Sequence, residues 1–242
     1  MPCNKTHRFH SLDGLSGIIY GMPGYCCLCG ALGVFDTGIC ERCRYVLRTQ
    51  MIHTCKVCGI PLPSPLTLCR DCQANMYYFE ACKSIGLYRG YLKSAIIRMK
   101  YYGERWLSRP LGLLLGEVAH SFHDAEMVVP VPLEPRSKQV RGYNQAKDLA
   151  LKVARKIYLP LNDILLREVP RERQARLNRA GRRQNLRGTM KTQGIFGIRS
   201  ATVLVVDDVT TTGATLDEAA RALKSAGARK VVCVTLARTL GN

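Results

Sequence analysis

The segment from Val203 to Thr215, VLVVDDVTTTGAT, constrains the fold of this chain more than any other. Four consecutive apolar residues at 203–206 predict a strand that is buried on both faces, as in a parallel sheet covered by helices. Two acids, Asp207 and Asp208, follow this strand, and a threonine-rich turn containing Gly213 comes next. The segment therefore predicts a strand, a turn and a helix of an α/β fold.

The rest of the chain after Ala81 alternates between two apolar patterns. Helical spacing is found at 91–101, at 143–157 and again before Gly227, where a helix is expected to end. Short apolar runs that predict strands lie at 127–131, 164–166, 202–206 and 231–236. Strands that alternate with helices indicate a mostly parallel sheet with helices on both faces.

The turn after the 203–206 strand has the residues of a sugar-phosphate site. In open parallel sheets, ligands bind beyond the carboxyl ends of the strands, and the N-terminus of a helix attracts phosphate. The two acids suit ribose hydroxyls, and a Mg²⁺ ion on a pyrophosphate would offset their charge. The groups expected to hold the phosphate belong to Thr210, Thr211, Thr212, Gly213, Ala214 and Thr215. A capped surface helix, the alternative, accounts for one threonine but not for the whole turn.

Twelve cysteines are present, and eight of them form four CxxC pairs. The pairs are Cys26–Cys29, Cys40–Cys43, Cys55–Cys58 and Cys69–Cys72, and the second four residues repeat the first four at an offset of 29. Two CxxC turns supply the four thiolates of a tetrahedral Zn²⁺ site, so the repeat predicts two structural zinc ions. Disulfides are the alternative, but a chain with no secretory signal is expected to stay in the reducing cytosol. Sequential and interleaved sharing of the metals both remain open.

The charge of the chain indicates a polyanionic partner or substrate. Thirty-six Lys and Arg against eighteen Asp and Glu give a net charge of +18. Arginines are dense between Arg167 and Lys191, and guanidinium groups bind phosphate through paired hydrogen bonds. No apolar run reaches the roughly 18 residues of a membrane span. We therefore expect a cytoplasmic protein, with peripheral contact at the inner face of the membrane left open.

The cysteine pattern and the apolar patterns divide the chain near Ala81. Residues 1–24 are expected to be an N-terminal extension, 25–80 a double zinc ribbon and 81–242 the α/β domain. The cysteine-rich part is short, and we expect it to depend on metal for its stability.

Three stretches together resemble the ComF competence-protein family. VVDDVTTTGAT resembles the phosphoribosyl-pyrophosphate (PRPP) signature of type I phosphoribosyltransferases, and the chain resembles their amidophosphoribosyltransferase-like branch. Val129–Ala150, VPVPLEPRSKQVRGYNQAKDLA, is similar to the PVP…RGxNQ…LA segment of the family, and Arg173–Arg187, RQARLNRAGRRQNLR, to its Q…L…R..N loop. The resemblance extends from about Tyr25 to Arg238 and includes the double zinc ribbon.

The resemblance implies a type I phosphoribosyltransferase fold and assigns roles to residues. Asp207 and Asp208 would hold the ribose hydroxyls, and Thr210–Thr215 the 5′-phosphate. Arg141 is the first candidate for a pyrophosphate contact and Lys100 the second, with an ordinary surface cation as the alternative for each. The candidates for a flexible catalytic loop that also contacts nucleic acid are Arg173, Arg176, Arg179, Arg183 and Arg187.

Two functions follow from the resemblance. In the first, the protein binds PRPP and single-stranded DNA during DNA uptake in natural transformation, alongside a DNA translocase or other competence proteins. In the second, it is an active phosphoribosyltransferase that acts on an unidentified amine or nucleobase. The high positive charge favours the first, because a small-molecule enzyme does not need it. The aromatic residues Tyr77, Tyr78, Phe79, Tyr101 and Tyr102 are expected either to stack on bases or to pack in the core or a hinge.

Overall fold

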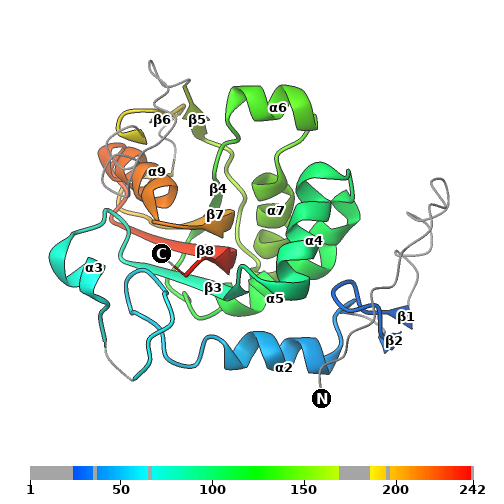
Figure 1. The fold of residues 1–242 in the computed structure, drawn as a ribbon. Helices are drawn as coiled ribbons and strands as arrows, with labels where there is room; N and C mark the ends of the chain where they lie inside the picture. Colours follow the sequence, from blue (N-terminus) through cyan, green and yellow to red (C-terminus); the bar gives the residue numbers. More distant parts are fainter. Residues whose placement is uncertain (1–23, 35–36, 65–66, 169–185, 195–196, 241–242) are drawn as a thin grey trace.

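The computed structural model describes residues 24–34, 37–64, 67–168, 186–194 and 197–240. Its centre is a four-stranded sheet in which all neighbouring strands are parallel. The strands, in spatial order, are β3 (Ala81–Leu87), β8 (Lys230–Arg238), β7 (Thr202–Thr210) and β4 (Met127–Pro130) (Figure 1). The parallel α/β architecture predicted from the sequence is confirmed.

Helices cover both faces of this sheet, because alternate residues of the central strand point to opposite sides. Leu204 and Val206 of β7 pack in one hydrophobic cluster, and Val203 and Val205 pack in another. The first face carries α4 (Gly90–Tyr101), α5 (Ser108–Ala119) and α7 (Gln145–Ile157). The second carries α9 (Ala214–Ser225) and a hairpin of β5 (Leu165–Arg167) and β6 (Met190–Thr192) (Figure 1).

The central strand is longer than the apolar pattern predicts. β7 continues past Val206 because β8 beside it is nine residues long and extends the ladder, pairing Asp207 with Thr235 and Thr210 with Arg238. The two acids therefore belong to the last part of the strand, where the paired backbone holds them rigidly. The predicted helices at 91–101 and 143–157 are found as α4 and α7, and α9 ends before Gly227 as expected.

Short elements connect the sheet and the helices. The helical turn η1 (Arg105–Leu107) leads from α4 into α5, and α6 (Pro135–Arg141) lies between β4 and α7. Helix α7 begins at Gln145 because the side chain of Asn144 accepts a hydrogen bond from the amide of Ala146 at 3.0 Å. Within the described ranges, no helix has both the length and the apolar character needed to cross a membrane.

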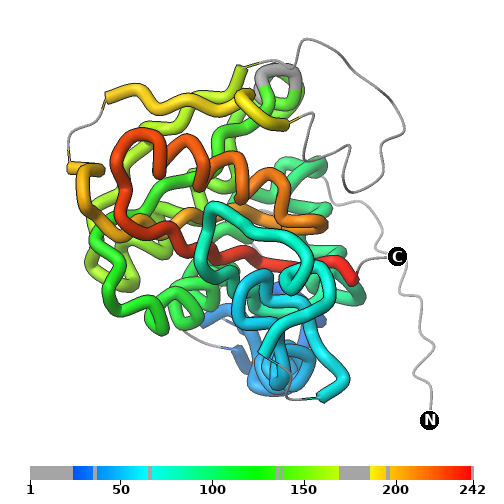
Figure 2. Tube along the Cα trace, turned by 90° about the vertical axis from the view of Figure 1, so that its left-hand side faces the viewer, coloured from blue at the N-terminus to red at the C-terminus, as the bar shows by residue number. Residues whose placement is uncertain are grey.

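The cysteine-rich segment lies along the β3 edge of the sheet. It contains a small hairpin of β1 (Gly24–Tyr25) and β2 (Leu32–Val34), followed by α2 (Glu41–Thr49) and α3 (Arg70–Ala74). Figure 2 shows this segment, in blue and cyan, at the opposite end of the molecule from the hairpin that contains β6. Its apolar side chains Leu28, Ile39 and Leu47 belong to the same cluster as Ile85 and Leu92. The division at Ala81 stays a prediction, but the two sides of it share one hydrophobic core.

Candidate functional site

The two acids at the end of β7 have different partners. Asp208 is held from two sides: Oδ1 lies 2.7 Å from Lys100 Nζ, and Oδ2 accepts a hydrogen bond of 2.7 Å from Gln145 Nε2. Asp207 uses Oδ1 to accept the amide of Asp208 at 2.8 Å. Both acids are buried. The orientation of Asp208 is therefore fixed by α4 and α7, whereas Asp207 is held by the backbone of its own strand.

Burial raises the pKa of Asp207 to about 7, and the negative charge of Asp208 acts in the same direction. The positive charges of Lys100 and Arg167 lower this pKa but do not outweigh burial. Both protonation states of the Asp207 carboxyl are consequently available near neutral pH. The carboxyl can accept a hydrogen bond from a ligand or bind a proton at low cost.

A pocket of about 180 Å³ opens beside the acids. Its walls are the turn after β4, the start of α7, the last residue of β5 and the first turn of α9, and it includes Asp207, Asp208 and Thr215. Two cations, Arg141 and Arg167, also line it. The buried Nε of Arg167 has no hydrogen-bond partner within the described part of the chain. The pocket therefore combines acids with guanidinium groups, one of which has a free donor.

Arg167 lines the pocket, whereas the sequence alone indicates it only as part of a basic stretch. It is the last residue of β5, while the two acids lie in the last part of β7. A signal was available, because a cation that directly follows a short apolar strand is expected at the carboxyl edge. The signal was weak, because β5 is only three residues long and belongs to a separate hairpin.

The two cations proposed for pyrophosphate differ in their surroundings. Lys100 lies against Asp208, while Arg141 lines the pocket and stacks its guanidinium on the ring of Tyr101 at 4.7 Å. The hydroxyl of Tyr143 donates to the carbonyl oxygen of Met99, which ties the start of α7 to α4. The α4 helix therefore supplies Asp208 with a lysine partner, and it supplies Arg141 of the pocket with the aromatic ring of Tyr101.

The threonine-rich turn between β7 and α9 presents its residues unequally. Thr215 lines the pocket, Thr211 is exposed, and Thr212 Oγ1 accepts the amide of Ala214 at 3.3 Å. The hydroxyl of Thr210 is buried and has no hydrogen-bond partner among the described residues. Gly213 has a φ of +82°, which only glycine adopts without strain. The turn places the N-terminus of α9 at the pocket, as the strand, turn and helix pattern predicts.

The eight CxxC cysteines form two separate groups of four thiols. Cys26, Cys29, Cys40 and Cys43 make the first group, and Cys55, Cys58, Cys69 and Cys72 the second. The sulfur atoms of Cys29 and Cys40 are 3.6 Å apart and those of Cys58 and Cys69 are 3.7 Å apart. Four sulfurs at about 2.3 Å from a tetrahedral metal lie about 3.8 Å from one another, so both groups fit such an ion. The sequential arrangement is therefore the one adopted, and none of the described cysteines forms a disulfide.

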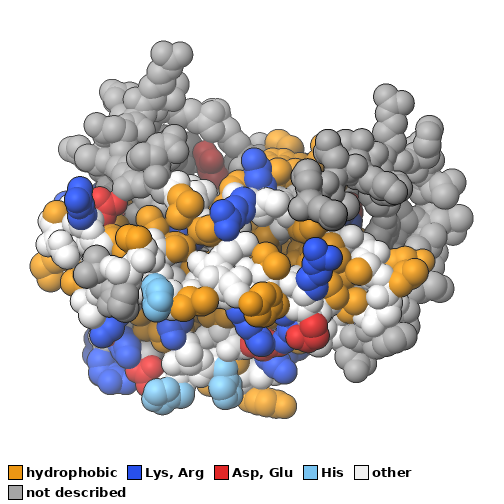
Figure 3. All heavy atoms as spheres, turned by 60° about the horizontal axis from the view of Figure 1, so that its bottom comes forward, with side chains coloured by type: hydrophobic (Ala, Val, Ile, Leu, Met, Phe, Trp, Pro, Cys, Tyr) orange, Lys and Arg blue, Asp and Glu red, His pale blue; other side chains and the backbone are white. Residues whose placement is uncertain are grey.

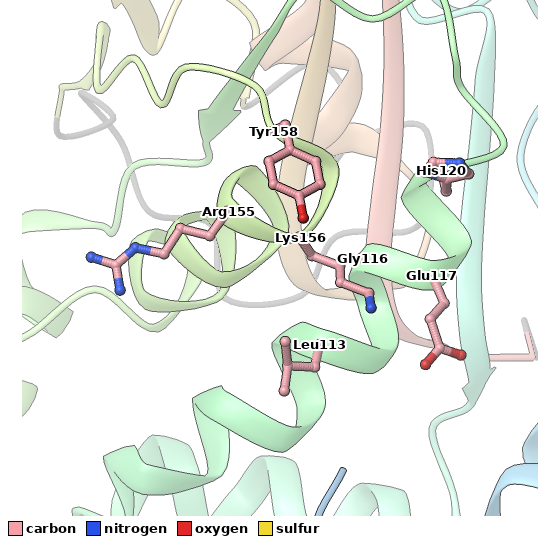
Figure 4. A pocket seen from close by; sticks show the side chains of 7 residues that line it. All are labelled: Leu113, Gly116, Glu117, His120, Arg155, Lys156 and Tyr158. Carbon is pink, nitrogen blue, oxygen red and sulfur yellow. The ribbon is translucent and has the colours of Figure 1, made fainter. Parts of the chain in front are cut away.

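Other candidates lie elsewhere. Arg173, Arg176, Arg179 and Arg183 fall outside the described residues, and Arg187 is exposed just before β6. A larger cavity, of about 580 Å³, lies between α5 and α7 and is lined by Leu113, Gly116, Glu117, His120, Arg155, Lys156 and Tyr158 (Figure 4). None of the predicted site residues lines it. The larger of these two cavities is therefore not the one beside Asp207 and Asp208.

Comparisons with known proteins agree with this architecture. The family described as "Phosphoribosyl transferase domain" matches residues 146–241. Competence protein F of Haemophilus influenzae is 31% identical, and the match covers 86% of this chain and 94% of that protein. The DNA utilization protein YhgH of Escherichia coli K12 is 28% identical, with 90% and 99% covered, and the competence protein ComFC of Bacillus subtilis is 27% identical, with 84% and 85% covered. The chain therefore belongs to the ComF family of competence proteins and has a phosphoribosyltransferase-type fold.

Proposed function

We propose that this protein acts in DNA uptake during natural transformation and that it binds PRPP at the acid pair. The observation that supports this ligand is the pocket at the carboxyl edge of the sheet, where three acids (Glu134, Asp207 and Asp208), two arginines and a helix N-terminus meet. The names of the relatives, competence protein and DNA utilization protein, support the biological role.

The acids, amides and arginines around the pocket match the different parts of PRPP. Asp207 and Asp208 accept hydrogen bonds from the ribose hydroxyls, and Lys100 and Gln145 keep Asp208 in one orientation. The amides at the start of α9 bind the 5′-phosphate. Arg141 and Arg167 bind the pyrophosphate, for which the Nε of Arg167, unpaired among the residues that the structure describes, offers a donor. A bound Mg²⁺ would neutralise the pyrophosphate through oxygen ligands.

Calorimetric titration of PRPP with Mg²⁺ tests this assignment. Asp208→Asn and Arg167→Met are each expected to weaken binding at least tenfold, because each removes a charged hydrogen bond worth about 1.5–3 kcal/mol. Arg155→Met, which removes an exposed cation at the other cavity, is the control and should bind as the wild type does. Equal affinity of all four proteins would contradict the assignment.

Turnover of PRPP is the second candidate function, and the pKa of Asp207 near 7 is the observation that favours it. A group that titrates near the working pH is suited to proton transfer. Release of labelled pyrophosphate, measured with and without candidate amines, nucleobases or single-stranded DNA, separates the two functions. Acceptor-dependent release that disappears in Asp207→Asn would establish an enzyme, and binding without release would establish a ligand site only.

Single-stranded DNA is proposed as the polyanionic partner. The outer face of α2 presents Arg42, Tyr45 and Arg48 at helical spacing, and Tyr45 is 70% exposed. Figure 3, which views the molecule from that side, shows basic side chains spread over the surface with few acids between them. Exposed tyrosine stacks on bases and arginine contacts phosphates.

Fluorescence anisotropy with labelled single-stranded DNA tests this surface. Tyr45→Ala should weaken binding by about five- to a hundredfold, the range for loss of one stacked base. Arg42→Ala should reduce the dependence of affinity on salt. Tyr158→Ala removes an even more exposed tyrosine from the end of α7 and serves as the control. If the control loses as much affinity as Tyr45→Ala, α2 is not the DNA surface.

Zinc is proposed as the metal of both cysteine clusters. Four thiolates with a tetrahedral arrangement match its preferred ligands. Elemental analysis should find two zinc ions per chain, and a value of one or none would contradict the paired sites.

A further inference from the structure

The segment that follows the second cysteine cluster (Cys55, Cys58, Cys69 and Cys72) contacts the turn at Thr210–Thr215, which we call the phosphate turn. Cys72 lies in α3, and five residues later the hydroxyl of Tyr77 donates to the carbonyl oxygen of Thr212 at 3.3 Å. The next amide, that of Tyr78, donates to Asp217 Oδ1 in the first turn of α9 at 2.6 Å. The segment between the cluster and β3 therefore contacts both the turn and the helix that follows it.

The aromatic rings of Tyr77 and Phe79 pack against this turn at Gly213. A Cβ atom at Gly213 would lie 3.2 Å from Cε1 of Tyr77 and 3.5 Å from Cζ of Phe79. The two rings pack on one another with centroids 4.7 Å apart, and Phe79 is 1% exposed. The left-handed backbone at Gly213 thus rests on two rings, so its shape depends on where those rings lie.

The other side of the second cluster is fixed to the sheet. The amide of Cys82 in β3 donates to the carbonyl oxygen of Val57 at 2.7 Å, and a Cβ at Gly59 would meet the Cys82 carbonyl oxygen at 2.3 Å. Val57 and Gly59 flank Cys58, which belongs to the same four-thiol group as Cys72. A metal ion in this group would therefore link the sheet edge to the segment that supports the turn.

The first cluster has different neighbours among the described residues. Helix α2, which starts after Cys40, contacts α5 through Arg44 and Glu117. The carbonyl oxygen of Cys27, inside the first CxxC pair, accepts a hydrogen bond from Arg98 in α4 at 3.4 Å. These contacts lie on the face of the sheet that carries α4, α5 and α7, away from α9, so the first cluster serves as a matched control for the second.

We propose that metal in the second cluster holds the phosphate turn in its binding shape, and that Tyr77 is the positioning residue through which it does so. The proposal rests on the proposed function of the turn as a phosphate site. A loaded cluster fixes Cys72 relative to Cys58, and the short segment to Phe79 then presses its rings against Gly213. Loss of this metal loosens the turn, and the affinity for ribose phosphates falls with it.

Equivalent cysteines of the two clusters provide the first test. Cys72→Ser and Cys43→Ser occupy the same position of the repeat, and each should lower the zinc content by one ion. Hydrogen exchange of the amides from Thr211 to Leu216 should rise at least tenfold in Cys72→Ser and stay near the wild-type rate in Cys43→Ser. Equal exchange in both variants would overturn the proposal. This measurement needs no ligand.

Tyr77 provides the second test, in variants that keep all eight metal ligands. Tyr77→Ala should keep two zinc ions yet weaken binding of ribose 5-phosphate about tenfold or more, because the turn loses the aromatic ring that packs against Gly213. Tyr77→Phe keeps the ring and should weaken binding about two- to tenfold, the range for one hydrogen bond. Wild-type affinity in Tyr77→Ala would refute the positioning role. If the wild type itself does not bind ribose 5-phosphate or PRPP, the proposed function fails, while the exchange comparison still decides the link between metal and turn.

Discussion

Two adjacent aspartates near the end of β7, Asp207 and Asp208, have identical side chains but different partners. Asp208 has an ion pair with Lys100 and a hydrogen bond from Gln145, which together compensate for its burial. Asp207 accepts a hydrogen bond from the amide of Asp208, and burial raises its pKa to about 7. The carboxylate of Asp208 is therefore held in one orientation by side chains from two helices, whereas Asp207 is the acid whose pKa is raised by burial.

Asp207→Asn tests this difference through the pH dependence of stability. The pKa of Asp207 in the folded chain is about 7, above its ordinary value of 3.8, so the unfolded chain loses its proton first as pH rises. Wild-type stability attributable to this group is therefore lost between about pH 4 and 7. Relative to the wild type, the variant should gain about 2–3 kcal/mol in unfolding free energy between pH 5 and 8, at 1.36 kcal/mol per pKa unit.

Urea unfolding of both proteins at each pH measures the difference in unfolding free energy between them. Subtracting the wild-type value from that of the variant removes the contribution of all groups that titrate in both proteins. A difference that does not change between pH 5 and 8 would show that Asp207 has an ordinary pKa.

At the scale of elements, α9 connects the threonine-rich turn after β7 to the β5–β6 hairpin. Glu218 is buried on this helix and accepts the amide of Met190 at 3.1 Å as well as two hydrogen bonds from Arg221. Arg221 in turn donates to the carbonyl oxygen of Met190 at 3.2 Å. The hairpin that carries Arg167 is therefore positioned by the same helix whose N-terminus faces the pocket.

Removal of this anchor has a predictable cost. Glu218→Ala leaves a partly buried arginine without its carboxylate, and loss of one partner of a buried pair costs about 3–5 kcal/mol. Because Arg221 is 23% exposed, we expect about 2–3 kcal/mol from urea unfolding, with faster hydrogen exchange at 190–192. Glu80→Ala breaks an exposed pair with Lys224 of the same helix and should cost less than about 1 kcal/mol. Equal losses in the two variants would argue against the anchor.

At the scale of the whole molecule, the cysteine-rich segment and the α/β part are joined by a partly buried ion pair. Arg44 of α2 reaches both oxygens of Glu117 in α5, at 2.6 and 2.7 Å, and its side chain is 10% exposed. The Oε1 of Gln50 also accepts a hydrogen bond from the amide of Leu87 at 3.0 Å. The cysteine-rich segment is thus packed as part of the core.

Arg44→Met is expected to lower the unfolding free energy of the whole chain by about 2–3 kcal/mol, since Glu117 loses its main partner. Arg48→Met removes a largely exposed arginine 3.8 Å from the same glutamate and should cost less than about 1 kcal/mol. Thermal unfolding followed by calorimetry gives both values. If Arg44→Met splits the transition and leaves the α/β part unchanged, the two parts fold independently.

The sequence by itself determined the features that depend on neighbours along the chain. The strand, acids, turn and helix around Asp207, the α/β alternation and the eight cysteines of the two four-thiol groups are all local patterns, because residue spacing alone decides which groups can face one side. Only the tertiary structure decided that Lys100 and Gln145 hold Asp208, that Arg167 lines the pocket and that Tyr77 lies under Gly213. The physical reason is that these contacts join residues distant in sequence, so they depend on how the helices and the cysteine clusters pack against the sheet.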